Sequence, residues 1–355
     1  MMSINRIVVF LIGPYPPPYG GISVHIQRLS EQLIRKNIKC IVCVSDKNVR
    51  EGSSTIITDN SVKLFLSQLL SHRKDIIHCH VFNPIIISIL SILTIVTRKG
   101  IIITLHSFRY DMNLINKFTF WISRWARINF IAVGPEIENI IISLGIKPEC
   151  VEVIPSFIPP SIKEVEITEI PPETWDFINN HNPVISANAF RISFYNNQDL
   201  YGIDMCINLC ANLKRDYPKI GFVFCLPDVG DYEYFSKMKQ RIKESGIEEN
   251  FFFQTKPCQF YPILMKSNVF VRPTNTDGYG VSIAEAIYFK VPSIASNVCP
   301  RPEGTIIFKS RDIDDFILKV KDVLDNYEEH KKRLESVILE DNAEKIIKIY
   351  QNLCK

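Results

Sequence analysis

Two acidic side chains, Asp277 and Glu285, stand eight positions apart in a stretch whose residue types suit a bound phosphate. Residues 269–296 read as a short apolar strand, a polar loop with glycine and proline, a short helix and a second strand. Such an element places a helix N-terminus at the carboxyl end of a parallel strand, where unpaired N–H groups and the helix dipole favour an anion. We therefore expect an anion site at the start of that helix.

Two histidines follow other apolar runs: His80 in DIIHCHVFN and His106 in TLHSFR. The carboxyl ends of strands in an open α/β sheet face the ligand crevice, so both side chains are candidates for binding or catalysis. For His80 the alternative is a structural side chain with satisfied hydrogen bonds. Ser107 and Arg109 stand beside His106, which favours the functional interpretation there.

The chain opens with an apolar strand, residues 6–12, followed by GPYPPPYGG and a helical pattern over residues 23–35 with Ser23 as a candidate N-cap. A strand, a glycine loop and a helix in this order indicate the start of a doubly wound α/β domain. Neither GxGxxG nor a P-loop occurs, which disfavours a nicotinamide oxidoreductase. Gly20 and Gly21 either form a tight turn only or allow the backbone to approach a ligand closely.

The elements that position these residues form two α/β halves. Near-continuous apolar strands alternate with helices through residue 133, as is typical of a parallel sheet covered on both faces. Residues 154–175 are rich in proline and lack a periodic pattern, so we expect a linker there. The α/β pattern restarts at residue 184. A cleft between two such halves is the natural ligand site.

Composition narrows the function classes. The chain has 355 residues, 46% hydrophobic and 22% charged, with a formal net charge of +3, which does not indicate a nucleic-acid-binding protein. Its ten cysteines form no disulfide or zinc pattern, so we expect free thiols in a reducing compartment. The acidic runs at 231–233 and 312–315 fit first turns of helices better than metal sites. We expect no metal.

Several motifs together resemble the GT4-type retaining glycosyltransferases. The strongest is Asp277-Gly278-Tyr279-Gly280 followed by Glu285-Ala286, which is similar to the family's donor-binding motif. GPYPPPYGGISVH, DIIHCH, TLHS and VEVIPSFI resemble other family segments, so the resemblance covers most of the chain. Among relatives, it is most similar to enzymes that build bacterial surface polysaccharides such as O-antigen or capsule.

The resemblance implies a GT-B fold, two Rossmann-like doubly wound domains facing across a cleft. We assign residues 1–165 to an N-terminal acceptor-side domain and 176–338 to a C-terminal donor-binding domain, with a C-terminal helix, 339–355, able to pack back on the N-terminal domain. The implied reaction moves a hexose from a nucleotide-diphosphate sugar, with retention and without a cofactor or metal. The implied partners are that donor and a saccharide or polyprenyl-linked acceptor.

Residue roles follow from matching positions. The resemblance implies donor-binding roles for Gly21, Arg191, Gly280, Val281, Ser282 and Glu285. It implies catalytic roles for Asp277 and His106, and acceptor-side roles for His80 and Arg109. Glu285 would bind the ribose hydroxyls, although Ser282 and Glu285 also have the spacing of a capping box. No protein nucleophile is implied, because the leaving diphosphate itself assists deprotonation.

The sequence departs from the family in its acid and its cations. Asp277 stands where the family usually has Glu, which puts its contact with the sugar in doubt. Tyr201 stands where a phosphate-binding lysine is expected before Gly202. We hypothesise that Arg272 supplies the missing cation through a bidentate phosphate contact. The alternative is that Arg272 pairs with Asp277 or another acid.

Membrane contact is a separate expectation. Residues 81–97 are apolar but shorter than the ~20 residues of a spanning helix, and residues 117–127 mix aromatic and basic residues as an interfacial helix does. Either stretch could instead be core. We expect a cytoplasmic protein, peripheral on the inner face of the cell membrane through its N-terminal domain. The alternatives to a transferase are a catalytically impaired donor-binding subunit and a nucleotide-sugar epimerase on the same fold.

Overall fold

The chain forms two compact units. The computed structural model describes residues 8–17, 19–44, 56–58, 75–97, 100–106, 114–126 and 128–354. The first unit comprises Met1–Ile158 with Asp341–Lys355, and the second comprises Pro159–Glu340. The chain thus leaves the first unit at residue 158, before the predicted boundary at 165, and returns to it at residue 341. Each unit is described by itself below.

The first unit is built on a seven-stranded parallel sheet with the order β3-β2-β1-β4-β5-β6-β7. The strands are β1 (Val8–Ile12), β2 (Lys39–Val44), β3 (Ile56–Thr58), β4 (Ile76–Cys79), β5 (Gly100–Leu105), β6 (Ile128–Ala132) and β7 (Val151–Val153). All four residues of β4 are buried, and successive ones face different cores: Ile76 packs in one and Ile77 in the other. Burial on both faces explains why these strands read as continuous apolar runs.

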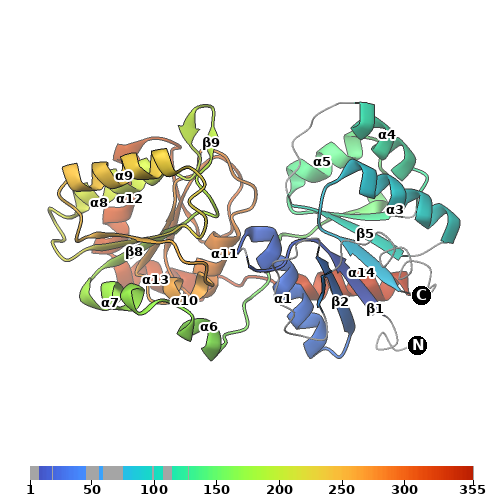
Figure 1. Cartoon of the computed structure of the whole chain (residues 1–355), viewed down its shortest axis with the longest axis horizontal. Helices are drawn as coiled ribbons and strands as arrows, with labels where there is room; N and C mark the ends of the chain where they lie inside the picture. Colours follow the sequence, from blue (N-terminus) through green and yellow to red (C-terminus); the bar gives the residue numbers. More distant parts are fainter. Residues whose placement is uncertain are drawn as a thin grey trace. The chain divides into compact units, whose positions relative to one another are not determined.

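Helices cover both faces of this sheet (Figure 1). They are α1 (Gly21–Arg35), α3 (Pro84–Thr97), α4 (Leu114–Ser123), α5 (Pro135–Ser143) and α14 (Asn342–Leu353), with the short 3-10 helix η2 (Pro148–Cys150). Helices α1 and α14 share one core, in which Leu29 and Tyr350 are fully buried. Helices α3, α4 and α5 share the core on the opposite face. The C-terminal helix is therefore part of the first unit's core.

The second unit has a six-stranded parallel sheet with the order β12-β11-β8-β13-β14-β15. Its strands are β8 (Val184–Asn188), β11 (Gly221–Cys225), β12 (Phe251–Gln254), β13 (Val269–Arg272), β14 (Ser293–Ser296) and β15 (Ile306–Phe308). A two-stranded antiparallel hairpin, β9 (Phe194–Tyr195) and β10 (Gln198–Asp199), precedes α8. The order reverses direction at β8, so this unit is doubly wound as well.

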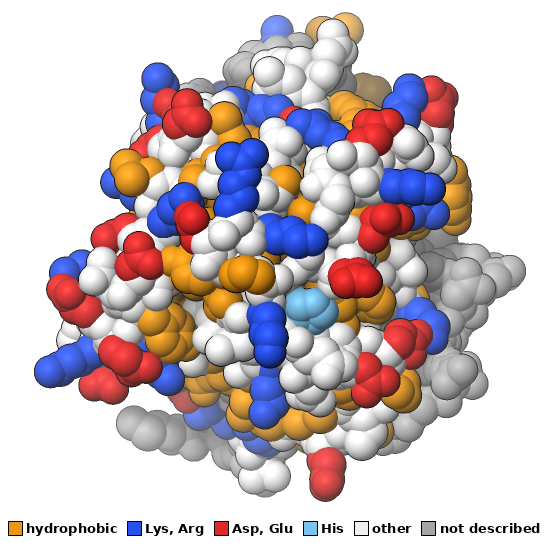
Figure 2. Space-filling model, turned by 90° about the vertical axis from the view of Figure 1, so that its left-hand side faces the viewer, with side chains coloured by type: hydrophobic (Ala, Val, Ile, Leu, Met, Phe, Trp, Pro, Cys, Tyr) orange, Lys and Arg blue, Asp and Glu red, His pale blue; other side chains and the backbone are white. Residues whose placement is uncertain are grey.

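Helices flank the second sheet in the same way. They are α6 (Glu164–Thr168), α7 (Pro172–Asn180), α8 (Ile203–Leu213), α9 (Tyr232–Glu244), α10 (Tyr261–Leu264), α11 (Val281–Tyr288), α12 (Ile313–Asp325) and α13 (Tyr327–Glu335). Asp231 and Asp312 are the N-caps of α9 and α12, and each side chain accepts a hydrogen bond from a backbone N–H of the first turn. On the face shown in Figure 2, basic and acidic side chains are interspersed. Lys237 and Glu233 form an ion pair along α9.

The doubly wound α/β prediction is confirmed for both units, and the predicted N-cap of the first helix is wrong. The chain passes from the first unit to the second at residue 158, inside the predicted linker 154–175, and α6 and the start of α7 also lie in this segment. Proline is compatible with the first turn of a helix, and Pro172 is the first residue of α7. Helix α1 begins at Gly21 with Gly20 as its N-cap, while the Ser23 hydroxyl accepts from the Gly20 N–H at 2.9 Å.

Candidate functional site

Helix α11 starts directly after the glycine loop that the sequence singled out. Gly280 is its N-cap and Val281 its first residue, so Ser282 lies inside the first turn. A capping box centred on Ser282 as the N-cap is therefore not how this helix begins. Glu285 lies one turn further on and is 5% exposed. The loop leaves the backbone N–H groups of the first turn at the carboxyl end of β13, where an anion is favoured.

Gly280 adopts a conformation that other residues rarely take. Its φ is +77°, in the left-handed region. A Cβ at this position would lie 2.8 Å from Ile283 Cδ1 and 3.1 Å from Arg301 Nη1. The turn into α11 thus depends both on this glycine's conformational freedom and on the space that its missing side chain leaves for an arginine.

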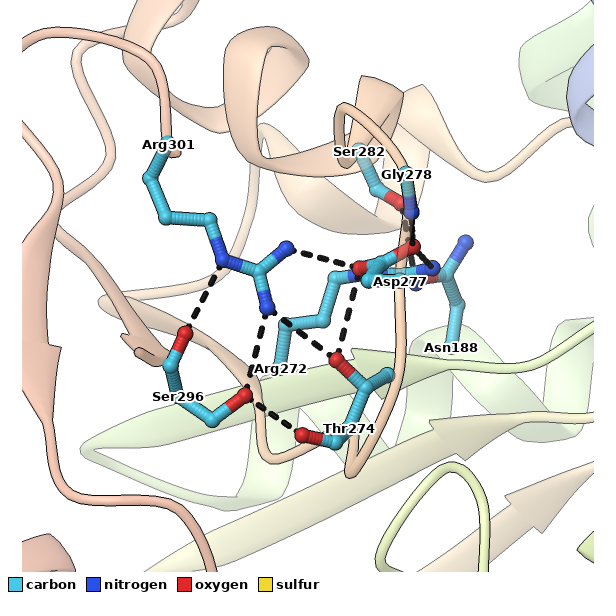
Figure 3. A network of polar contacts seen from close by, with 8 residues as sticks. All are labelled: Asn188, Arg272, Thr274, Asp277, Gly278, Ser282, Ser296 and Arg301. Carbon is cyan, nitrogen blue, oxygen red and sulfur yellow. Dashed lines mark hydrogen bonds and ion pairs between the residues drawn. The ribbon is translucent and has the colours of Figure 1, made fainter. Parts of the chain in front are cut away.

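Asp277 is the centre of a charged network (Figure 3). Arg272 donates to it bidentately, with Nε 2.6 Å from Oδ2 and Nη2 3.1 Å from Oδ1. Arg301 Nη1 donates to Oδ2 at 2.7 Å. Burial by itself raises the pKa of Asp277, but the charges and hydrogen bonds of the two arginines outweigh it and hold the pKa well below its usual value. The carboxylate is therefore ionised and paired.

Arg301 is the member of this network that sequence reasoning missed. Its side chain is 1% exposed. Besides Asp277, it donates from Nε to the Ser296 carbonyl at 3.0 Å and from Nη2 to Thr274 Oγ1 at 3.1 Å. It lies in the loop that follows β14, where no periodic pattern or motif marks it. The one available signal was its place after the carboxyl end of a parallel strand.

Arg272 lies at the end of β13 with one nitrogen weakly engaged. Its Nη1 is 3.4 Å from Asn188 Oδ1 and 3.5 Å from Ser282 Oγ, both long for hydrogen bonds. The guanidinium carbon lies 5.7 Å from the ring centroid of Tyr201, the residue that replaces the expected lysine. Arg272 does pair with Asp277, as the alternative interpretation held, and it also faces the first turn of α11.

Arg191, the other predicted phosphate ligand, pairs elsewhere. Its Nε and Nη2 donate to Asp228 Oδ2 at 2.8 and 2.5 Å, and its side chain is 55% exposed. Ion pairs this exposed contribute little to stability. Exchanging Asp228 for a phosphate would therefore cost little.

In the first unit, His80 and His106 are brought together with a third histidine, His25 of α1. His80 Nδ1 and His106 Nε2 are 3.2 Å apart, and the rings of His25 and His106 have their centroids 4.9 Å apart. One ring nitrogen from each of the three lies within 4.8 Å of the others, an arrangement that could hold a metal ion. The sequence predicted the strand-end pair but not His25, which lies on the buried face of a helix.

Burial keeps these imidazoles neutral. It lowers the pKa of His25 to about 4, against which the hydrogen bond from Nδ1 to the Ser156 carbonyl, 2.7 Å long, acts only partly. Burial also lowers the pKa values of His80 and His106, and the neighbouring histidines lower them further. Among the described residues, nothing bonds to the buried Nε2 atoms of His25 and His80. The cluster thus offers uncharged ring nitrogens rather than positive charge.

Two further predicted residues are placed less fully. Gly21 is the first residue of α1, and a Cβ there would meet no atom within 4 Å, so a ligand could approach its backbone. Arg109 lies outside the described residues.

Comparison with known families identifies the two halves separately. Residues 19–162 match the model for Glycosyltransferase Family 4, and residues 188–337 match that for Glycosyl transferases group 1. The chain belongs to the GT4-type glycosyltransferases of the GT-B fold. A sequence search of curated proteins gives no match.

Solved GT-B glycosyltransferases have a similar structure over nearly the whole chain. A glycosyltransferase from Rickettsia africae ESF-5 superposes with a TM-score of 0.74 at 14% identity, covering 98% of this chain and 99% of that one. Anabaena Alr3699/HepE in complex with UDP-glucose gives 0.68 at 12% identity, covering 98% of each chain. The lipopolysaccharide outer core galactosyltransferase WaaB gives 0.59 at 17% identity, covering 98% of this chain and 99% of that one. Because the sequence identities are this low, the structural similarity shows a shared GT-B fold and carries no conclusion about substrates.

Proposed function

We propose that this glycosyltransferase moves a hexose from a nucleotide-diphosphate sugar to a saccharide acceptor, with retention at the anomeric carbon. The observation that carries the proposal lies in the segment 272–282 of the second unit, here called the donor loop. In it, Arg272 faces the first turn of α11, whose N–H groups begin at Val281. A diphosphate fits this place because helix N-terminus and guanidinium both favour negative charge. The complexes of Alr3699/HepE with UDP and UDP-glucose support a nucleotide donor.

In the proposed reaction, the donor loop stabilises the leaving group. Negative charge develops on the diphosphate as the glycosidic bond breaks, and donors already fixed there stabilise the transition state more than the ground state. Gly280, Val281 and Ser282 supply backbone N–H groups, Arg272 and Arg191 supply cations, and Glu285 binds the ribose hydroxyls. No metal is needed for this charge balance.

The histidines belong to the acceptor side in this proposal. His106 is half-buried at the end of β5, and its pKa is lowered by burial, so it is neutral at physiological pH. A neutral imidazole can accept a hydrogen bond from a sugar hydroxyl. His80 would orient it through their 3.2 Å contact.

Donor binding is tested by thermal shift with UDP, GDP, ADP and their glucose conjugates. A nucleotide that binds only the folded protein raises the melting temperature by mass action. Glu285→Gln should weaken the best nucleotide about tenfold, because a carboxylate accepts both ribose hydroxyls and an amide does not. Glu233→Gln, on the exposed surface of α9, is the control. Unchanged affinity in a folded Glu285→Gln protein would remove the ribose assignment.

Turnover decides between a transferase and a donor-binding subunit. The purified chain should hydrolyse its donor slowly or transfer the hexose to an added saccharide, with the product anomer matching the donor. Binding without either reaction would identify an impaired subunit instead.

A membrane-bound acceptor is proposed on the surface of α3 and α4. The two helices pack through Ser88–Thr119 and Ser91–Ser123 hydroxyl contacts of 3.0 and 2.9 Å. They and the turn after α4 expose apolar side chains: Ile85, Ile89, Ile92, Ile95, Val96, Leu114, Ile115, Phe118, Trp121 and Trp125. Tryptophan and aliphatic side chains suit the membrane interface. None of the described helices has the length and apolar composition needed to cross a membrane.

We propose that this surface rests on the cytoplasmic face of the cell membrane and receives a polyprenyl-linked acceptor for surface polysaccharide assembly. Liposome flotation tests it. Replacing Trp121 and Trp125 by Ala should lower the bound fraction, whereas Tyr232→Ala, an equally exposed aromatic change on the second unit, should not. Equal flotation of the two variants would remove the tryptophans from the membrane contact.

A further inference from the structure

The resemblance assigns Asp277 to the donor sugar, but its contacts leave no free acceptor for a sugar hydroxyl. Its two oxygens accept five hydrogen bonds, from Arg272 Nε and Nη2, Arg301 Nη1, the Gly278 N–H and Thr274 Oγ1, at distances between 2.6 and 3.3 Å. A carboxylate has about four lone-pair sites. Its side chain is 12% exposed. Asp277 therefore binds the neighbouring arginines rather than the donor sugar.

The three charged groups do not cancel. Two guanidinium groups and one carboxylate leave a single positive charge in a nearly water-free site. Arg301 cannot present that charge to a ligand, because it is 1% exposed and all three of its nitrogens donate to the protein. Arg272 is 13% exposed, and within the described part of the chain the polar contacts of its Nη1 are 3.4 Å or longer. The uncompensated charge is thus presented at Arg272 Nη1, beside Ser282 of α11.

We infer that Arg301 is a positioning residue that neutralises Asp277, so that Arg272 keeps its charge for the donor's diphosphate. Without Arg301, the bidentate Asp277 would cancel the charge of Arg272, and only the N-terminus of α11 would still attract an anion there. Asp277 in turn fixes the guanidinium plane, while the ring of Tyr201 lies 5.7 Å from its central carbon. Two arginines thus take the place of the missing lysine: Arg272, which is partly exposed, and Arg301, which is buried. This inference rests on the proposed donor site.

The same geometry brings Gly280 and Arg301 into contact. Arg301 Nη1 lies 3.1 Å from where a Gly280 Cβ would be. Arg301 therefore also abuts the N-cap of the helix whose N–H groups would hold the diphosphate. The Arg301 side chain thus contacts both the turn at Gly280 and the carboxylate of Asp277, which holds Arg272.

The test changes the net charge of the cluster of Arg272, Asp277 and Arg301 and measures the affinity for a nucleoside diphosphate. The probe is the nucleoside diphosphate among UDP, GDP and ADP that raises the melting temperature most, with the matching nucleoside as a phosphate-free reference. Arg301→Gln brings the charge of the cluster from +1 to 0, and the double variant Arg301→Gln/Asp277→Asn returns it to +1. Arg311→Gln is the control, because among the described residues Arg311 pairs with Asp204 and with none of the three charged residues of the cluster.

Arg301→Gln should weaken the diphosphate about tenfold while changing nucleoside affinity less than twofold. The double variant should bind the diphosphate within about threefold of the wild type, although two of three network residues have changed. Arg311→Gln should leave both affinities unchanged. The double variant also keeps the test decisive if Arg301→Gln does not fold, since its cluster keeps the wild-type net charge of +1, carried by Arg272 alone.

Two results would overturn the inference while leaving the donor site intact: a folded Arg301→Gln protein with wild-type diphosphate affinity, or a double variant weakened more than tenfold. Equal loss for diphosphate and nucleoside would show a general structural defect and would also refute it. If none of the three diphosphates binds the wild type, the proposed donor site itself fails, and the inference with it.

Discussion

Both units place polar side chains at or after the carboxyl ends of parallel strands, but the buried groups are neutral in one unit and charged in the other. His80 and His106 follow β4 and β5 in the first unit, as Arg272 and Arg301 lie at or after the ends of β13 and β14 in the second. The histidines avoid charge, because burial lowers their pKa values. The arginines keep theirs, because a guanidinium stays protonated in proteins, and Asp277 lies between them as their counter-ion.

The difference shows that a strand-end position predicts a site but not its chemistry. Desolvation penalises the charged form of any group. Without a counter-ion, the imidazoles give up their protons. Guanidinium groups stay protonated, and in the second unit one carboxylate is their counter-ion, in bidentate contact with Arg272 and in single contact with Arg301. The basicity of the side chain and the presence of an acid thus separate a neutral cluster from a cationic one, and the following experiments test that separation.

Removing the acid should have the largest effect. Asp277→Ala leaves two buried guanidinium groups without their counter-ion, so we expect it to lower the free energy of unfolding by about 3–5 kcal/mol. Denaturant unfolding of the purified chain measures the loss. Asp228→Ala, which breaks the exposed pair with Arg191, should cost less than about 1 kcal/mol. Similar losses in both variants would mean that burial does not distinguish the two pairs.

Acid should act on the two clusters at different pH values. The folded pKa of His25, about 4, lies below its usual 6.5, so its stability contribution is complete above pH 6.5 and is lost as the pH falls toward 4. This amounts to about 3 kcal/mol at 1.36 kcal/mol for each pKa unit. The pKa of Asp277 is also lowered, so its contribution persists until the pH falls below its usual 3.8.

We therefore expect the first unit to lose protection first on acidification. Hydrogen exchange between pH 7 and 4 should show β4 and β5 opening before β13 and β14. Earlier loss of protection in β13 would contradict the assignment of neutral histidines to one unit and a stably ionised carboxylate to the other.

Gly280 offers a smaller and more local test. Gly280→Ala should cost about 1–2 kcal/mol for its left-handed conformation and more for the contact with Arg301. Gly246→Ala is the matched control, because Gly246 also has positive φ, +65°, but a Cβ there would meet nothing within 4 Å. The difference between the two free energies of unfolding isolates the contacts of the new Cβ with Ile283 and Arg301. Equal losses would show that these contacts are easily relieved.

Metal removal should have the smallest effect. We expect EDTA to leave donor hydrolysis or transfer unchanged, because in the proposed reaction the arginines and helix N-terminus balance the diphosphate's charge. Activity that disappears with EDTA and returns with Zn²⁺ would contradict this. His25→Ala should then abolish the restoration, since His25 completes the only three-histidine group among the residues described.

The sequence predicted what depends on periodic patterns and local spacing. Continuous apolar runs identified the strands, and the loop with Asp277 and Gly280 identified the start of α11. Contacts between distant residues could not be read in this way. Arg301 reaches Asp277 across 24 positions of the chain, and His25 lies on an amphipathic helix where a polar residue on the buried face looks like an exception.

Two local rules compete at each of two places in the chain. The spacing of Ser282 and Glu285 satisfies a capping box, but the positive φ of Gly280 starts the helix two residues earlier. Prolines between residues 154 and 175 indicated a linker, although proline at the first helical position favours a helix, as at Pro172. In both cases the outcome depended on backbone conformation that residue types alone do not specify.

Helix α14 has a consequence for the order in which the chain can fold. Ile346, Ile347 and Tyr350 of α14 are buried in the core of the first unit, and Tyr350 forms a 2.6 Å hydrogen bond with His78 of β4. All of the second unit is synthesised before these residues appear. During translation the second unit can therefore finish folding first. Until α14 is synthesised, the apolar surface of the first unit that it covers stays exposed to water. That interval is when a nascent chain would be most exposed to aggregation and most in need of a chaperone.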